Sequence, residues 1–261
     1  MLAPSVSQLQ RLTIAPAQIV GAEIRLTPEQ RHYLWRVLRL QKGDRLLAMD
    51  GLGHCWLVAA DPPDQVQILA EQVPQASTEL PRPVVLLVAM PKGQAMDDIV
   101  RQSTELGATQ IVPIVSDRTL LQPSPQKLDR WRRIAQEAAE QSERQFVPAI
   151  FDPQPWSNAL NTWNAETCEA YLCEARGDRP HLLSTLLPRR GASPSTKPLA
   201  IAIGPEGGWT DAEINGAIAA GYQVVSLGRR VLRAMTAPAA ALSIVAAALE
   251  QDMSCNSGLV G

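Results

Sequence analysis

Alternating apolar and polar positions mark the first part of the chain. Such alternation runs through Asp44–Asp50 and again through His54–Ala60, and the turn-forming run Asp50-Gly51-Leu52-Gly53 separates the two. A period of two is typical of strands that bury one face, and glycine after aspartate is common in hairpin turns. The pattern therefore predicts hairpin strands of a small β-barrel.

One helix is expected among these strands, over Pro28–Leu40. Leu34, Val37 and Leu38 form an apolar stripe along it, at the spacing of one helix face. The arginines of this segment fall largely off the stripe, at Arg31, Arg36 and Arg39. Charged faces of this kind are usually solvated, so a solvated amphipathic helix and a functional basic face stay equally open.

The segment Glu71–Pro83 separates two differently patterned regions. Its sequence, EQVPQASTELPRP, is rich in proline and small polar residues, as linkers are. The boundary is predicted near residue 80, which divides the chain into domains of residues 1–80 and 81–261.

Beyond the linker, unbroken apolar runs of strand length replace the alternation. These runs lie at Pro83–Met90, Ala108–Val115, Ala170–Cys173, Pro198–Ile203 and Tyr222–Leu227. Helical patterns cover Asp97–Leu106 and Asp129–Glu143, and each of the last three strands leads through a loop into a helix. Continuous apolar strands that alternate with helices are typical of a parallel sheet covered on both faces. The predicted fold class of this part is therefore α/β.

Composition narrows the class of protein. With 46% hydrophobic and 19% charged residues in 261, the chain is not collagen-like, coiled-coil or disordered. The longest apolar stretch, Ala237–Leu249, contains Ser243 and is shorter than a membrane helix, so no membrane association is expected. Met1–Arg11 lacks the pattern of a secretory signal, which favours a cytoplasmic location. The four cysteines match no paired metal-ligand spacing, so no metal is expected.

Charge argues at first against a nucleic-acid partner. Lys and Arg total 24 against 26 Asp and Glu, which gives a net charge of -2 and no overall attraction to a polyanion. Of these basic residues, however, 20 are arginine and only 4 are lysine. Arginine binds phosphate through two parallel hydrogen bonds and stacks on bases. A local basic patch is therefore compatible with the composition.

Two glycine-bearing loops are the strongest candidates for chemistry. In the first, an apolar run ends on Gly204-Pro205-Glu206-Gly207-Gly208, and the pair Thr210 and Glu213 forms a capping box that starts a helix. Glycine lets the backbone approach a ligand closely, and open α/β sheets bind ligands at the carboxyl ends of their strands. The loop matches neither common phosphate-loop pattern. Taken alone, it is explained equally well as a simple chain reversal.

The second loop follows the next strand, where Val224–Leu227 ends on Gly228 and a further segment leads into the last helix. Two strands that end in glycine at one sheet edge can present two backbone loops to one ligand. Arg229 and Arg230 are more simply explained as solvated loop residues. Arg233 lies between apolar residues, which favours a functional role.

Taken together and in this order, these motifs resemble those of one family. The chain is similar to the RsmE family, the 16S rRNA (uracil-N3) methyltransferases of the SPOUT class, over nearly its whole length. The N-terminal signature is His32-x-Leu34-x-x-Val37-Leu38-Arg39 with Gly43-Asp44 and Asp50-Gly51. The signatures of the catalytic domain are Thr104–Gly107, Glu137–Ser142 with Arg144 and Pro148, Gly204–Gly208 and Leu227–Arg233.

The resemblance implies a fold, a cofactor and partners. The expected fold is α/β, a SPOUT-type parallel sheet with a trefoil knot, preceded by a small N-terminal PUA-like β-barrel domain that binds RNA. The expected reaction is methylation of uridine N3 in the 16S rRNA of the small ribosomal subunit. S-adenosylmethionine would bind in the knot, and the active site would lie at the interface of a homodimer. Such an enzyme takes part in rRNA processing and ribosome biogenesis.

The expected site residues follow from the resemblance and from the chemistry of the reaction. Cofactor contacts are expected from Leu172, Ile203, Gly204, Pro205, Glu206, Gly207, Gly208, Leu227, Gly228, Val231, Leu232, Arg233, Thr236 and Ala237. RNA contacts are expected from Arg31, Arg36, Arg39, Arg144, Arg229 and Arg230. Arg233 is the expected catalytic side chain, because its cation can stabilise an N3 anion or a neighbouring carbonyl oxygen. Glu206 is the nearest alternative as a base, although a carboxylate in a glycine turn is more often a backbone acceptor.

Two positions depart from the usual pattern of the family. Ala234 and Met235 stand where members often have threonine and glutamate, and Glu143 stands where glycine is common. If the missing glutamate were the base, the chain would be inactive; the alternative, which stays equally open, is that this position does not supply the base. Three functions therefore stay open: the 16S rRNA methyltransferase, a SPOUT methyltransferase that acts on another RNA such as tRNA, and an inactive paralogue that binds RNA.

Overall fold

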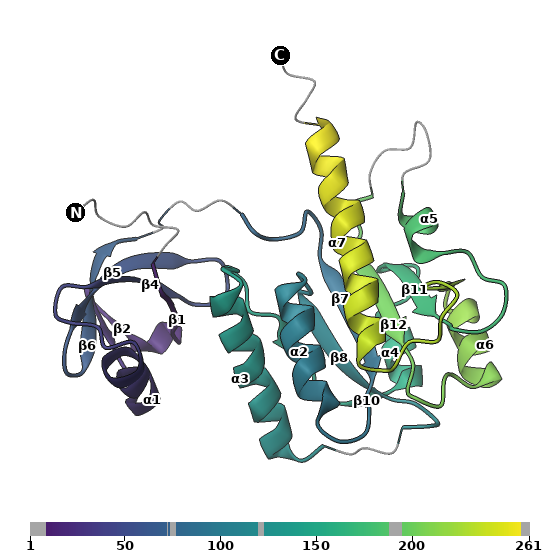
Figure 1. The fold of residues 1–261 in the computed structure, drawn as a ribbon, viewed down its shortest axis with the longest axis horizontal. Coiled ribbons are helices and arrows are strands. Elements are labelled where there is room, and N and C mark those ends of the chain that lie inside the picture. The colour runs from purple at the N-terminus through teal and green to yellow at the C-terminus, as the bar shows by residue number, and fades with distance from the viewer. Residues whose placement is uncertain (1–8, 72, 74–76, 120–122, 188–194, 257–261) are drawn as a thin grey trace. The chain divides into compact units, whose positions relative to one another are not determined.

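The computed structural model describes residues 9–71, 73, 77–119, 123–187 and 195–256, without the side chains of residues 252–256. The chain divides into two compact units (Figure 1). The first comprises Met1–Glu79 and Ala139–Val147, and the second comprises Leu80–Ala138 and Pro148–Gly261.

The first unit is built on a six-stranded sheet that is antiparallel except where β1 runs parallel to β4. The strand order is β1-β4-β5-β6-β3-β2. The strands are β1 (Arg11–Thr13), β2 (Ile19–Val20), β3 (Glu23–Arg25), β4 (Arg45–Met49), β5 (Cys55–Asp61) and β6 (Gln65–Ala70), with a 3-10 helix, η2 (Pro16–Gln18), before β2. The hairpin predicted from the alternation is confirmed as β4 and β5, in which Met49 pairs with Cys55 across the turn.

Strand β4 is buried on both faces, although its pattern predicts one buried face. Leu46 and Ala48 belong to the main apolar cluster of the unit, while Leu47 and Met49 belong to a second cluster. Ala139 is a member of that second cluster. The segment after residue 138 therefore covers the face of β4 that the alternating pattern predicts to be exposed.

The helix predicted over Pro28–Leu40 is two shorter elements. An α-helix, α1 (Pro28–His32), begins at the capping residue Thr27, and a π-helix, η3 (Tyr33–Val37), follows it. A π-turn takes in an extra residue, which moves later side chains off the expected stripe. Leu34 is fully buried as predicted, but Val37 is 57% exposed, so the apolar stripe was wrong at that position.

The second unit is a parallel sheet in the order β10-β8-β7-β12-β11-β13, with β9 beside β8. The strands are β7 (Val84–Ala89), β8 (Gln110–Val115), β9 (Ala149–Ile150), β10 (Gln154–Pro155), β11 (Glu169–Cys173), β12 (Leu199–Ile203) and β13 (Gln223–Val225). The helices are α2 (Ala95–Glu105), α3 (Pro125–Gln141), α4 (Trp156–Thr162), α5 (Leu182–Leu186), α6 (Asp211–Ala219) and α7 (Thr236–Asn256).

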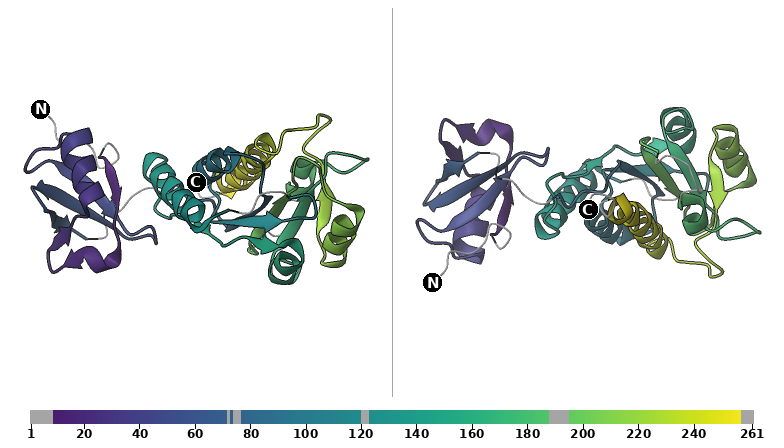
Figure 2. Two further views of the ribbon diagram at one scale, coloured as in Figure 1. Left: turned by 90° about the horizontal axis from the view of Figure 1, so that it is seen from below. Right: turned by 90° about the horizontal axis from the view of Figure 1, so that it is seen from above.

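Helices cover both faces of this sheet. Helices α2 and α7 lie on one face, and α4 and α6 lie on the other (Figure 2). Every residue of β7 and β12 is buried, as expected for central strands with two covered faces. The prediction of a parallel α/β sheet from continuous apolar runs is confirmed.

The strand order brings loops from distant parts of the chain together. Strand β13 pairs with β11 and not with β12, which directly precedes it, so the connection from β12 to β13 passes over β11. Backbone hydrogen bonds then link the two strand ends, because Glu174 donates to Val225 and Ser226 donates to Pro180. The trefoil knot that the family resemblance implies stays a prediction.

Two further features concern the described residues only. No helix among them is long and apolar enough to cross a membrane. They also contain no cluster of three or more His, Cys, Asp or Glu side chains placed to hold a metal ion. Of the four cysteines, those whose side chains the structure describes are Cys55, Cys168 and Cys173, and none of these three forms a disulfide.

Candidate functional site

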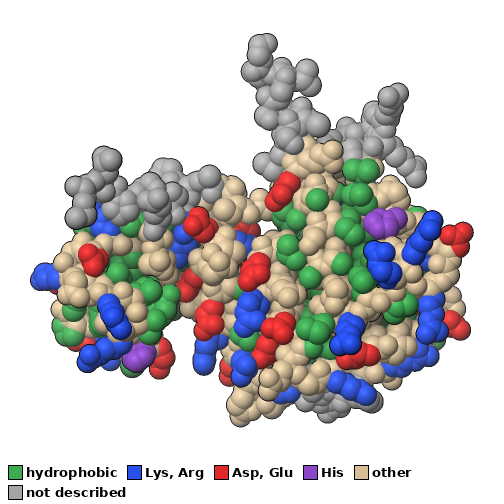
Figure 3. Space-filling model, in the orientation of Figure 1, with side chains coloured by type: hydrophobic (Ala, Val, Ile, Leu, Met, Phe, Trp, Pro, Cys, Tyr) green, Lys and Arg blue, Asp and Glu red, His purple; other side chains and the backbone are tan. Residues whose placement is uncertain are grey.

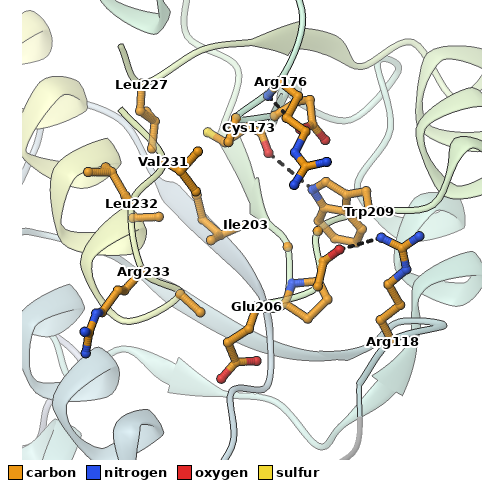
Figure 4. A pocket seen from close by; sticks show the side chains of 18 of the residues that line it. Arg118, Cys173, Arg176, Ile203, Glu206, Trp209, Leu227, Val231, Leu232 and Arg233 are labelled. Atoms are coloured by element: carbon orange, nitrogen blue, oxygen red, sulfur yellow. Dashed lines mark hydrogen bonds between the residues drawn. The ribbon is translucent and has the colours of Figure 1, made fainter. Parts of the chain in front are cut away.

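A cavity of about 930 Å³ opens at the carboxyl ends of the parallel strands of the second unit (Figure 4). The loops after β7, β11, β12 and β13 line most of it. Open α/β sheets bind their ligands at this edge, and both glycine-bearing loops singled out in the sequence lie here. The cavity is therefore the candidate functional site.

The loop after β12 is closely packed at its first glycine. A Cβ added at Gly204 would lie 3.0 Å from Nε1 of Trp209, and Gly208 has a φ of +72°, which favours glycine. Trp209 itself is buried, with its ring 4.7 Å from that of Trp156. Its indole nitrogen donates to the carbonyl of Cys173 at 3.3 Å (Figure 4). Trp209 thus packs in the core and also lines the cavity.

A buried carboxylate fixes the far end of this loop to the loop after β8. Glu213 is 7% exposed, and its Oε2 accepts the backbone N–H of Thr210 at 2.8 Å, which completes the predicted capping box. Its Oε1 accepts the backbone N–H of Asp117 at 2.9 Å. Next to it, the guanidinium of Arg118 donates to the carbonyl of Gly207. Through these bonds, the loop after β8 holds the glycine loop in place.

The loop after β13 forms the opposite wall of the cavity. Gly228 has a φ of +117°, and its N–H donates to the Ser226 hydroxyl at 3.0 Å. Beyond it, Val231 and Leu232 turn apolar side chains toward the cavity (Figure 4). The segment ends where the Arg233 carbonyl accepts the N–H groups that open α7.

Most residues expected to contact a cofactor line this cavity. Those that do are Ile203, Gly204, Pro205, Glu206, Gly207, Gly208, Leu227, Gly228, Val231, Leu232, Arg233 and Ala237. Two do not: Leu172 is fully buried inside β11, and Thr236 lies in the first turn of α7 outside the lining.

Lining residues after three strands were not predicted from the sequence. They are Pro91 with Lys92, after β7, Arg118, after β8, and Cys173–Gly177 with Arg179, after β11. Each follows a strand that the apolar runs predict, so the rule that ligands bind at strand ends could have found them. Burial raises the pKa of the Cys173 thiol to about 12, so this thiol stays neutral and contributes an apolar contact.

The two candidate catalytic residues lie on different parts of the lining. Glu206 is exposed, and its Oε1 accepts the backbone N–H of Lys92 at 3.0 Å, as a structural acceptor in a glycine turn does. Arg233 is exposed, and its guanidinium points away from the middle of the cavity, on the side opposite Arg118 (Figure 4).

The arginines expected to contact RNA differ in their availability. Arg36, Arg229 and Arg230 are exposed, while Arg31 forms an ion pair with Asp64. Arg39 is also exposed, with a φ of +57°.

Arg144 does not fit the role expected for it. Its side chain is 2% exposed and is held by the Glu79 carboxylate, with Nη2 and Oε2 2.6 Å apart. A guanidinium buried and paired in this way cannot reach an RNA phosphate, so Arg144 is a structural residue of the first unit.

Comparisons with known proteins agree with this architecture. A model of the RNA methyltransferase domain matches residues 78–246, and a model of the RNA methyltransferase PUA domain matches residues 26–59. A curated Synechocystis protein named ribosomal RNA small subunit methyltransferase E is 46% identical over 92% of this chain and 78% of its own length. A Bacillus subtilis protein of the same name is 31% identical over 84% of this chain and 88% of its own length. The chain belongs to the RsmE family.

Solved structures related to the RsmE family share its fold. The Neisseria gonorrhoeae ribosomal RNA small subunit methyltransferase E, solved with bound S-adenosylmethionine, superposes with a TM-score of 0.77 at 28% identity. The superposition covers 90% of this chain and 96% of the Neisseria chain. A Legionella pneumophila methyltransferase with bound S-adenosylmethionine has a TM-score of 0.79 at 25% identity and covers 92% and 98%. The predicted family, and the fold class of a parallel α/β sheet after a PUA-like domain, are confirmed.

Proposed function

We propose that this chain is an S-adenosylmethionine-dependent methyltransferase that methylates N3 of a uridine in the 16S rRNA of the small ribosomal subunit. One observation carries the proposal: a single cavity joins the two glycine loops at the ends of β12 and β13, in a chain 46% identical to a curated RsmE protein. Related structures with this fold are described with bound S-adenosylmethionine.

The residues around the cavity fit this cofactor. Leu227, Val231 and Leu232 supply apolar side chains suited to the flat face of an adenine ring. The glycine loop lines the cavity with backbone groups, and it leaves little room for side chains: a Cβ at Gly204 or Gly207 would make a tight contact of 3.0 Å with Trp209 or Arg118. These residues would hold the cofactor mainly through the backbone and through apolar contacts.

When bound, S-adenosylmethionine supplies an electrophilic methyl group to the uridine N3. The task of the chain is to align the two reactants, which can lower the activation free energy by about 7 to 11 kcal/mol. A general base contributes less: it typically raises the rate by roughly 10²- to 10⁴-fold, which corresponds to about 3 to 5 kcal/mol. We propose that Arg233 stabilises the negative charge left on the uracil when N3 loses its proton. Glu206 is the candidate base within the lining.

Two substitutions test these roles. Arg233→Ala is expected to lower kcat by at least about 10² while the protein keeps its fold. Glu206→Gln keeps an oxygen that can accept the Lys92 N–H but removes the basic carboxylate. An unchanged kcat for Glu206→Gln would leave Glu206 as a loop anchor only, and an unchanged kcat for Arg233→Ala would remove Arg233 from the mechanism.

We also propose that the enzyme acts as a homodimer in the cytoplasm, where small ribosomal subunits are made. The support for a dimer is α7, which carries no charged residue from Thr236 to Leu249. A helix that is apolar on all sides is usually buried on all sides.

The function is tested by methyl transfer to small ribosomal subunits from a strain that lacks the enzyme. We expect the purified protein to form 3-methyluridine in their 16S rRNA, measured by mass spectrometry of the digested nucleosides. Transfer to tRNA alone would replace the proposal with a methyltransferase for another RNA. No transfer to any RNA, together with no S-adenosylmethionine binding in calorimetry, would identify an inactive RNA-binding paralogue.

A further inference from the structure

The cavity is surrounded by positive charge, although the whole chain has a net charge of -2. Among the described residues, its lining contains six Lys and Arg side chains against three Asp and Glu. The cations are Lys92, Arg118, Arg176, Arg179, Arg230 and Arg233, and the anions are Glu174, Glu206 and Asp211. Figure 3 shows Lys and Arg side chains gathered over the part of the second unit that carries α5, α6 and the loop before α7.

Two of these arginines lie on the loop after β11, residues Glu174–Pro180, here called the β11 arch. Both ends of the arch are held to the end of β13, because Glu174 donates to Val225 and Ser226 donates to the carbonyl of Pro180. Inside the arch, the Glu174 carboxylate accepts the N–H of Arg176 at 2.8 Å. The loop therefore presents its arginines from a backbone that is fixed at three points.

The arch arginines are free to bind an external anion. Arg176 and Arg179 are exposed, and among the described residues neither forms an ion pair. Elsewhere in the second unit, Arg82, Arg101 and Arg132 are each paired with an acidic side chain. One acidic residue of the arch, Asp178, is exposed and offsets part of the charge.

A third guanidinium lies close to the arch. Arg118, from the β8 loop, is held by the carbonyl of Gly207, and Figure 4 shows Arg118 and Arg176 on either side of Trp209. The two side chains reach the same wall of the cavity from different strand ends. Arg233 lies on the other side, so this wall has its own positive charge.

S-adenosylmethionine does not account for this charge. Its sulfonium and ammonium groups outnumber its single carboxylate, so the cofactor is itself a cation, and an excess of arginine beside it is unfavourable. A polyanion is the ligand that such a wall suits, and arginine forks match phosphate oxygens. Enzymes that modify a base also pull the target nucleotide out of its stack, which leaves the flanking phosphates to be held.

Resting on the proposed function, we propose that Arg176 and Arg179 of the β11 arch, with Arg118, bind phosphate groups of the target RNA strand beside the base to be methylated. The arch is thus a second RNA contact, separate from the arginines of the N-terminal unit. It fixes the strand at the cavity mouth, whereas the N-terminal arginines would hold RNA through the first unit.

The test compares the double variant Arg176→Gln/Arg179→Gln with Arg133→Gln. Arg133 is also exposed and forms no ion pair among the described residues, but it lies on α3 away from the cavity lining. Binding to unmethylated small ribosomal subunits is measured by filter binding at several salt concentrations, and S-adenosylmethionine binding by calorimetry. We expect the double variant to lose at least tenfold in subunit affinity and about two units of salt slope, one for each phosphate contact.

The S-adenosylmethionine Kd of the double variant should stay within twofold of the wild-type value, and Arg133→Gln should change neither measurement. Subunit affinity equal to that of Arg133→Gln would overturn the proposal. So would a tenfold weaker S-adenosylmethionine Kd with unchanged subunit affinity, because the arginines would then hold the cofactor carboxylate. Binding does not require turnover, so a wild-type protein that binds subunits through the arch without methylating them would refute the proposed function and leave the arch intact.

Discussion

Glu143 holds a backbone conformation that residues with a side chain rarely adopt. Its φ is +62°, in the left-handed region, which costs roughly 1 to 2 kcal/mol for a residue with a Cβ. Its carboxylate bonds Arg11, with Oε2 3.1 Å from Nη2, and the Arg11 side chain is only 7% exposed. The ion pair offsets part of the backbone strain at this position.

Glu143→Ala and Glu143→Gly separate the strain from the ion pair. Both variants lose the carboxylate and its bond to Arg11, so they differ only in the Cβ at positive φ. We expect the glycine variant to be more stable by about 1 kcal/mol in the free energy of unfolding, measured by urea denaturation followed by circular dichroism. An alanine variant of equal or greater stability would show that the backbone relaxes without strain.

The neighbouring residue shows what sequence reasoning cannot see at this scale. The family resemblance marked position 143 as one where glycine is common, and the positive φ explains that preference. The same signature suggested Arg144 as an RNA contact, yet Arg144 is buried against Glu79. The partner lies 65 residues away in the chain, and pairing at that separation leaves no periodic pattern in the sequence.

At the scale of elements, Glu213 connects three parts of the site. It caps α6 through Thr210, binds the backbone of Asp117 after β8, and so holds the glycine loop after β12 between them. Carboxylate bonds to backbone N–H groups are among the stronger hydrogen bonds in proteins. An uncapped loop of this kind would have to be ordered by the cofactor, at the expense of binding affinity.

Glu213→Ala is therefore expected to lower both stability and cofactor affinity. We expect a loss of about 2 kcal/mol in the free energy of unfolding and an S-adenosylmethionine Kd raised by about tenfold, measured by urea denaturation and calorimetry. Asn215→Ala, at an exposed position of the same helix, is the matched control and should change neither. A less stable variant with unchanged cofactor affinity would make Glu213 a helix cap with no role in positioning the loop.

Long, regular elements could be predicted from the sequence, and short or irregular ones could not. Strands such as β7 and β12 were predicted because two covered faces produce an unbroken apolar run. The π-helix after α1 was not, because Leu34 and Val37 fit an ordinary helical stripe and the extra residue in the turn has no sequence signal. The β11 arch was also missed as part of the site, since it carries one glycine, at Gly177, and matches no motif.

At the scale of the whole molecule, the net charge of -2 argues against a nucleic-acid partner, but the distribution of charge does not. The six cations of the lining come from the ends of several strands that lie far apart in the sequence. Only the strand order, with β13 beside β11, brings these loops to one edge. Composition averages over the chain, so it cannot show a patch assembled by folding, and a low net charge is compatible with RNA binding that is local and salt-sensitive.

Helix α7 is the remaining feature that a single copy of the chain leaves incomplete. Leu242, Val245 and Leu249 are buried within the second unit. On other sides of the helix, Ile244 is half-buried and Ala247 is exposed. Figure 3 shows hydrophobic side chains along the visible face of α7. A second copy of the chain would cover this surface, as the proposed homodimer requires.

Ala247→Arg tests this role of α7 by adding a large cation to the exposed face. We expect the wild-type protein to sediment at equilibrium with twice the 28.3 kDa mass of the chain, and Ala247→Arg to sediment as a monomer, because a buried unpaired guanidinium costs several kcal/mol at an interface. Ala219→Arg, the same change at an exposed position of α6, should remain a dimer. If Ala247→Arg remains a dimer and Ala219→Arg becomes a monomer, the interface lies on α6 instead. A monomeric wild-type protein at micromolar concentration would mean that the apolar face of α7 is tolerated in water and that the cavity binds its ligands within one chain.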